Sequence, residues 1–226
     1  MTDPTRPVTE DLGRRRSGGW TGALVVAWAV LVLLSSAAVA GSAWVAPRFV
    51  RVGLQGAHVE LVNGGGDGTT EEDLIVAYTE SLGGVAERLS SAVLPWSLAT
   101  AFAAVVLLFS ALRLVCGTER GRRWTRGALV VLAALAAAGA VHTSNTLLPD
   151  SAAWTAQLCD DVVGLFRLTG EGFDAGALAA IVSSRGVRSA IWGVAVLTAL
   201  PTVALFLLTG TAHVRAWCAS RTRTRA

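Results

Sequence analysis

The sequence predicts an all-α integral membrane protein: a four-transmembrane-helix bundle with a small extracytoplasmic cap, α-helical with a short β part, made from two outer loops. Hydrophobic residues make up 53% of the 226 residues and charged residues 15%, about ten percentage points fewer charges than an average soluble domain has. Four stretches contain no Asp, Glu, Lys or Arg, namely residues 17–47, 89–112, 127–149 and 189–214. Each is longer than the ~20 residues that a spanning helix needs.

The charged residues between these stretches alternate in sign along the chain. Carboxylates outnumber arginines seven to three in residues 48–88 and five to three in residues 150–188. Arginines outnumber carboxylates five to one in residues 113–126, and the tail 215–226 holds four arginines and no carboxylate. Because cytoplasmic loops carry an excess of Lys and Arg, we expect both termini and the middle loop to face the cytoplasm.

Tryptophan, which prefers the headgroup boundary of a bilayer, marks the ends of the same spans. The expected inner ends hold Trp20, Trp124 and Trp217, and the expected outer ends hold Trp44, Trp96 and Trp192. The expected segments are a disordered cytoplasmic arm (1–19), the first span (20–46), the first outer loop (47–91), the second span (92–114), a cytoplasmic loop (115–125), the third span (126–148), the second outer loop (149–187), the fourth span (188–214) and a cytoplasmic tail (215–226).

The first span has an alternative interpretation as a cleaved secretory signal. Three arginines at residues 14–16 precede an apolar run that ends in the small-residue pattern of residues 38–40. The apolar core of a signal covers about 7–15 residues, whereas residues 21–40 already form a longer run. We therefore expect an uncleaved span.

The two outer loops contain sequence signals for strands and helices, which predict that they fold into the cap. In residues 50–62, apolar side chains alternate with polar or small ones, which predicts a short β-hairpin. Threonines at 69–70 precede an acidic first turn, which predicts a helix that the glycines at 83–84 end. The second loop is expected to form a helix over residues 150–168 and then a shorter helix capped by Asp174.

A polar patch in the third span is the nearest feature to a site inside the bundle. It consists of His142, Ser144 and Asn145, which lie close to the expected outer boundary. A haem or metal ligand there would need a second histidine at similar depth, and His58 is the candidate. We expect a hydrogen-bonded interfacial patch, with no cofactor and no bound metal.

Two further features have simple structural interpretations. Pro201 lies midway along the fourth span and removes a backbone hydrogen bond, so we expect a kink, with Thr198 or Thr202 satisfying the freed carbonyl. The glycine-rich and acidic residues 63–73 offer oxygens to Ca²⁺ but lack the EF-hand spacing. A turn followed by a helix cap explains them.

The basic residues at the cytoplasmic ends of the spans are expected to face anionic lipid headgroups. These residues are Arg113, Arg120, Arg122, Arg123, Arg126 and Arg215. Recruitment of a cytoplasmic partner is the alternative.

Cys116 and Cys218 are expected to stay reduced in the cytoplasm, whereas Cys159 on the outer side is either a buried thiol or a bridge to another chain.

Function is inferred mostly from the classes that the sequence excludes. The motifs GxSxG and HExxH and a phosphate loop do not occur, and the arginines beside the spans are topology signals that do not indicate nucleic-acid binding. The four spans hold no Asp, Glu, Lys or Arg in their interiors, which disfavours a coupled transporter. All nineteen basic residues are Arg, which indicates a GC-rich, bacterial genome.

We expect a non-enzymatic bacterial inner (cytoplasmic) membrane protein. Its expected role is that of an accessory, assembly or signalling subunit, which binds other proteins through the acidic outer cap, or binds a second copy of itself. The alternative is a small transporter or channel component that forms a pathway as an oligomer, lined by hydroxyls near Pro201. A membrane enzyme ranks third.

Overall fold

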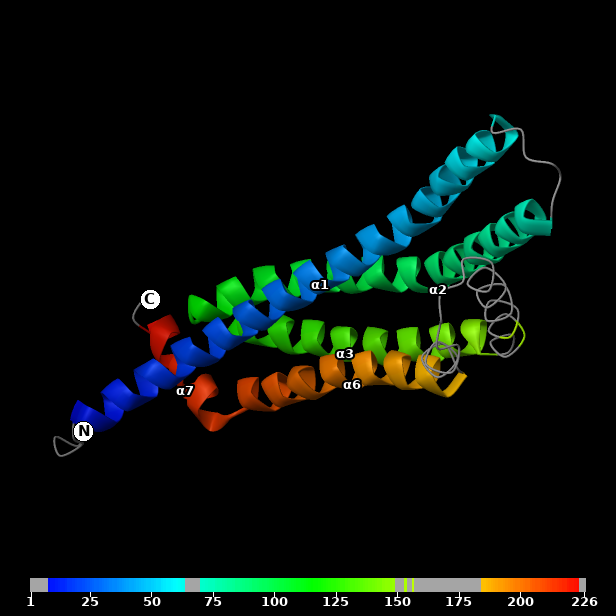
Figure 1. Cartoon of the computed structure of the whole chain (residues 1–226). Helices are drawn as coiled ribbons and strands as arrows, with labels where there is room; N and C mark the ends of the chain where they lie inside the picture. Colours follow the sequence, from blue (N-terminus) through cyan, green and yellow to red (C-terminus); the bar gives the residue numbers. More distant parts are fainter. Residues whose placement is uncertain (1–7, 64–69, 149–152, 154–155, 157–183, 224–226) are drawn as a thin grey trace. The chain divides into compact units, whose positions relative to one another are not determined.

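A computed structural model of the chain describes residues 8–63, 70–148, 153, 156 and 184–223 (Figure 1). All regular structure in these residues is helical, without a strand, as expected for an all-α protein. The helices, labelled as in Figure 1, are α1 (Val8–Asn63), α2 (Thr70–Val115), α3 (Glu119–Leu147), α6 (Ser184–Thr209) and α7 (Ala212–Arg223).

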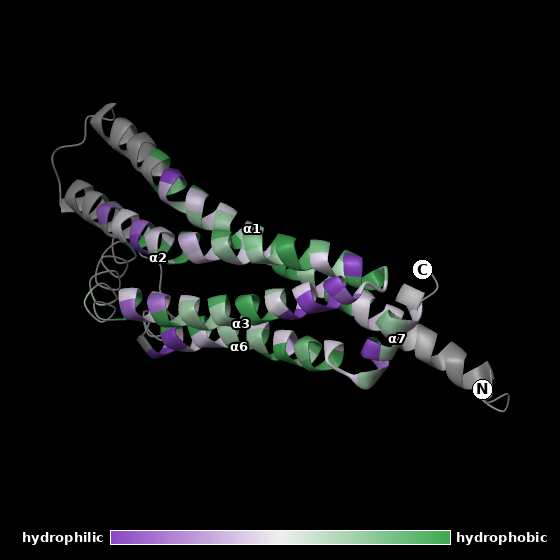
Figure 2. Cartoon of the chain, turned by 180° about the vertical axis from the view of Figure 1, so that it is seen from behind, coloured by the Kyte–Doolittle hydropathy of each residue, from purple (hydrophilic) through white to green (hydrophobic). Residues whose placement is uncertain are grey.

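Four of these helices are long and apolar enough to cross a membrane, as the sequence predicts. Their apolar portions are Gly19–Val50, Gly83–Val115, Glu119–Leu147 and Arg185–Thr209. Figure 2 shows hydrophobic residues along the middle of α1, α2, α3 and α6 and hydrophilic residues towards their ends. This distribution is that of helices whose middles lie in hydrocarbon and whose ends meet water.

The β-hairpin predicted over residues 50–62 is wrong, because these residues continue α1 to Asn63. Residues 8–19 also belong to α1, although they were expected to be disordered, and α2 runs through the glycines at 83–84 that were expected to end a helix. Extending an existing helix needs no new nucleus, and each interior glycine costs only about 1 kcal/mol. The helices predicted over residues 150–168 and after Asp174 lie outside the described residues.

The chain divides into two compact units, and each contains a part of every span. The terminal unit comprises Met1–Ala37, Leu98–Ala138 and Ala195–Ala226, and the distal unit comprises Ala38–Ser97 and Gly139–Val194. The core of the terminal unit is apolar: Val25 from α1, Leu107 from α2, and Leu129 and Leu132 from α3 are fully buried. Side chains therefore fill the space between these helices.

The connection between α2 and α3 is a tight turn with both helix ends capped. Gly117 has φ 77°, and the backbone N–H groups of Gly117 and Thr118 donate to the carbonyls of Leu114 and Arg113 at 2.8 and 3.3 Å. This is the Schellman pattern of helix termination. The Thr118 hydroxyl then accepts the N–H of Gly121 at 3.1 Å, which caps the start of α3.

The fourth span ends earlier than residue 214, where the sequence places its boundary. α6 ends at Thr209, and after Gly210 the chain starts the separate helix α7 at Ala212. Val214, Trp217 and Cys218 lie on one face of α7 and pack against Leu114 of α2. The apolar residues at the start of the tail thus cover the end of α2.

Candidate functional site

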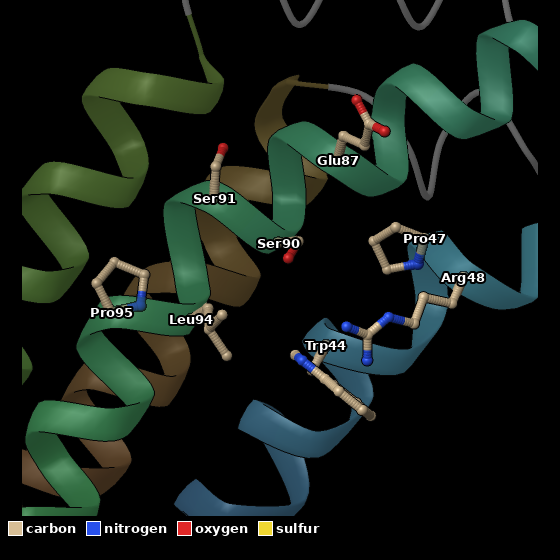
Figure 3. Close-up of a pocket in the computed structure, with 8 residues that line it drawn as sticks. All are labelled: Trp44, Pro47, Arg48, Glu87, Ser90, Ser91, Leu94 and Pro95. Carbon is tan, nitrogen blue, oxygen red and sulfur yellow. The ribbon is translucent and has the colours of Figure 1, made fainter. Parts of the chain in front are cut away.

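An open cleft of about 400 Å³ lies between α1 and α2 in the distal unit (Figure 3). It lies near the ends of the two apolar portions that the charge pattern assigns to the outer boundary. The lining residues are Trp44, Pro47 and Arg48 from α1, and Glu87, Ser90, Ser91, Leu94 and Pro95 from α2. The cleft therefore combines a cation, a carboxylate and hydroxyls.

The position of the Arg48 guanidinium is fixed by an aromatic ring. Its Cζ atom lies 3.4 Å from the centroid of the Trp44 ring, and Figure 3 shows the side chain running back along α1 towards that ring. A guanidinium over an indole face is held electrostatically, by ~0.5–1 kcal/mol at exposed sites. In the same view the Ser90 oxygen points towards α1, whereas the Ser91 side chain points away from it.

Two prolines in the cleft leave backbone carbonyls without their usual helical donors. Pro47 has no N–H for the carbonyl of Ala43, and Pro95 has none for that of Ser91, because a proline cannot donate to residue i−4. Hydroxyls near Pro95 engage other carbonyls of α2: Ser91 donates to Arg88 at 2.9 Å and Ser97 to Val93 at 2.7 Å. Backbone carbonyl oxygens near the two prolines are therefore hydrogen-bond acceptors, in addition to the polar side chains of the cleft.

The polar patch predicted in the third span lies on α3 in the distal unit, against an aromatic side chain of α2. The His142 ring lies 5.6 Å from the Trp96 ring, centroid to centroid, at an interplanar angle of 50°. A side chain at Gly139 would touch the same indole at 3.4 Å, so the glycine allows Trp96 to pack closely on α3. The sequence identifies Trp96 only as a boundary marker.

The other members of the patch point in different directions. The Ser144 hydroxyl is buried and has no hydrogen-bond partner among the described atoms, whereas His142 and Asn145 are exposed. The Thr146 hydroxyl donates to the His142 carbonyl at 2.9 Å. Within the described residues, no group of three or more His, Cys, Asp or Glu side chains is placed to hold a metal ion. His58, the second ligand considered, has no described side chain.

The six arginines expected at the cytoplasmic boundary differ in their surroundings. Arg122 is mostly buried and donates to both carboxylate oxygens of Glu119, at 3.0 and 2.6 Å. Arg126 places its Cζ 4.3 Å from the centroid of the Phe206 ring. The Arg122 ion pair thus lies within α3, and the Arg126 contact joins α3 to α6. The remaining four arginines are exposed, namely Arg113, Arg120, Arg123 and Arg215.

The two described cysteines also differ. Cys116 is exposed in the turn after α2, and Cys218 is buried on the inner face of α7. Burial, and secondarily the charge of Glu119, raises the pKa of the Cys218 thiol. The thiol is therefore neutral at physiological pH, and a neutral thiol is a poor nucleophile. Cys159 lies outside the described residues.

Pro201 lies inside α6, as expected, with its polar neighbours satisfied within the terminal unit. The Thr202 hydroxyl donates to the carbonyl of Thr198 at 2.6 Å. The same oxygen accepts the indole N–H of Trp28 from α1 at 3.1 Å. Thr198 or Thr202 was expected to satisfy the carbonyl that Pro201 frees, which is that of Leu197, but the Thr202 hydroxyl bonds to the carbonyl of Thr198 instead. Its link to Trp28 depends on how α1 and α6 pack, which the sequence does not indicate.

Comparison with protein-family models, with curated proteins and with solved structures found no match for the chain.

Proposed function

We propose that the chain is a non-enzymatic subunit of the bacterial inner (cytoplasmic) membrane that binds another protein on its outer side, with both termini in the cytoplasm. The observation that carries this proposal is the length of two helices. Beyond the apolar portions, α1 continues from Val50 to Asn63, and α2 starts at Thr70, well before Gly83. At ~1.5 Å per residue, each extension reaches about 20 Å past the span.

The extensions suit a protein partner more than a lipid. The extension of α1 holds Arg51 and Glu60, which balance in charge, whereas that of α2 holds a run of three carboxylates at residues 71–73 and Glu80, which repel the anionic headgroups of a bilayer. α1 and α2 meet where the extensions leave the spans, since a side chain added at Gly83 would lie 3.9 Å from Val50. The acidic extension of α2, beside a polar cleft, is complementary in charge to a basic protein surface.

The transporter alternative has less support from the same structure. It requires hydroxyls near Pro201 to line a pathway, but the Thr202 side chain is only 1% exposed and bonds to Trp28 and Thr198. The core between the helices of the terminal unit is filled by leucine, alanine and valine. A pathway between chains, as the alternative assumes, would therefore lack the Thr202 hydroxyl in its lining, and for this reason we favour an accessory, assembly or signalling subunit.

The test is co-isolation of a partner in mild detergent, followed by native mass spectrometry. In the test variant, the outer carboxylates are neutralised as Glu71→Gln, Glu72→Gln and Asp73→Asn. In the control, the same number are neutralised on the other side of the membrane, as Asp3→Asn, Glu10→Gln and Asp11→Asn. We expect a stoichiometric foreign chain with the wild type and the control, and its loss with the test variant.

Two results would contradict the proposal. One is recovery of the chain only as a homo-oligomer that conducts or transports in proteoliposomes. In that case the variant Pro201→Ala, which restores a backbone donor in α6, should alter the transport and identify the pathway alternative. The other is a partner that both triple variants retain equally, which would exclude the acidic extension as its binding surface.

A further inference from the structure

A second hollow, which the proposed function does not use, lies between α2 and α3 in the terminal unit. It is an apolar groove of about 630 Å³. Ala103 and Ala128 are almost fully buried and form its floor, whereas Phe102, Trp124 and Val131 are 72%, 63% and 52% exposed and form its walls. Small residues in the floor and large residues in the walls form a groove that is open on the outer surface of the helices.

The groove is about as long as one leaflet of a bilayer is deep. Along α3 it extends from Arg123 to Leu135, which is about 18 Å at ~1.5 Å per residue. One leaflet of a ~30 Å hydrocarbon core is about 15 Å deep. An extended acyl chain that follows the apolar lining over this length places its headgroup at the Arg123 end of the groove.

One end of the groove is cationic. Arg123 lines that end, its side chain is 77% exposed, and its Nε donates to Glu119 at a long 3.4 Å. Its other guanidinium N–H groups remain available for a bidentate contact with a phosphate. Arg120, one turn earlier on the same face of α3, is exposed as well. The nearby carboxylate of Glu119 is neutralised chiefly by Arg122, at 2.6 Å.

We propose that this groove binds one anionic glycerophospholipid of the cytoplasmic leaflet. An acyl chain lies in the groove from Trp124 to Leu135, and the phosphate contacts Arg123 and Arg120. Charge and dimensions together select this occupant. The apolar walls match a hydrocarbon chain, and the arginines stand at the end that the charge pattern assigns to the cytoplasmic surface, where anionic headgroups and tryptophan rings lie.

A substitution at Gly127 tests whether the groove is the lipid site. Gly127 lines the groove, and a Cβ added there meets no atom within 4 Å. The side chain of Gly127→Leu therefore starts in open space within the lining of the groove, where it competes with an acyl chain. Gly193 of α6 is equally open but lies outside the groove, so Gly193→Leu is the matched control. Both changes replace a helical glycine by a better helix former, and neither is expected to prevent folding.

The purified full chain is titrated in mild detergent with dioleoyl phosphatidylglycerol and with dioleoyl phosphatidylcholine, and bound lipid is counted by native mass spectrometry. We expect the wild type and Gly193→Leu to retain one phosphatidylglycerol, roughly tenfold more tightly than phosphatidylcholine. Gly127→Leu should lose this lipid. Arg123→Gln combined with Arg120→Gln should reduce the preference for the anionic lipid to about one. Arg113→Gln, which removes an exposed charge outside the groove, should preserve it.

Several outcomes would overturn this assignment. Equal retention of the two lipids by the wild type would show that the arginines do not select the headgroup. Retention by Gly127→Leu, or equal losses with Gly127→Leu and Gly193→Leu, would show that the groove is not the site. A change in the number of protein chains with Gly127→Leu alone would identify a second copy as the occupant. None of these readouts depends on the outer protein partner.

Discussion

The indole N–H of Trp28 and the hydroxyl of Thr202 form a polar contact between two apolar helices. The Nε1–Oγ1 distance is 3.1 Å, and Thr202 is almost completely buried. Thr202→Val keeps the shape but leaves the indole N–H without its acceptor. We expect a loss of about 1 kcal/mol in the free energy of unfolding, and a coupling energy of about 0.6 kcal/mol between Trp28→Phe and Thr202→Val in a double-mutant cycle.

The measurement is reversible unfolding in a detergent titration followed by circular dichroism. Trp192→Phe is the control, because Trp192 is 42% exposed and lies on α6 outside the terminal unit. Combined with Thr202→Val it should give additive changes, since distant sites do not couple. A coupling near zero for Trp28 and Thr202 would show that the hydrogen bond does not contribute to stability.

At the scale of elements, the turn between α2 and α3 depends on one left-handed residue. Gly117 has φ 77°, a conformation that costs a residue with a Cβ roughly 1–2 kcal/mol. Gly117→Ala should therefore destabilise the protein by about that amount in thermal unfolding in detergent. Gly127→Ala is the control, because this helical glycine has open space around it and no positive φ. If the two alanine variants unfold at the same temperature, the positive φ of Gly117 does not limit which residues the turn accepts.

The sequence predicts the spans more reliably than the elements beyond them. Charge-free stretches determine the spans directly, and all four are found. The alternation in residues 50–62 is short, and a helix that has already crossed the membrane extends through it at little cost. The start of α2 at Thr70 agrees with the threonine cap expected there, whereas α7 depends on a packing surface on α2 that is not visible in the sequence.

At the scale of the whole molecule, hydropathy predicts how many spans there are but not which residues meet between them. The contact of Trp96 with His142, the cleft around Arg48 and the groove between α2 and α3 each combine residues of two consecutive helices. Most residues of a membrane-facing helix are apolar whether they contact lipid or protein. The hydrophobic pattern therefore carries little information about which helices pack together, and only the polar and small residues indicate it.

Orientation is the property of the whole molecule on which both proposals depend, and it can be measured directly. Single cysteines are introduced at exposed positions as Glu80→Cys on the extension of α2 and Arg120→Cys at the start of α3. The background carries Cys116→Ser, Cys159→Ser and Cys218→Ala. Because arginine-rich loops stay in the cytoplasm, a membrane-impermeant maleimide should label Glu80→Cys in intact cells and Arg120→Cys only after permeabilisation. The opposite pattern would move the acidic extension of α2 into the cytoplasm and exclude both the outer partner and the cytoplasmic-leaflet lipid.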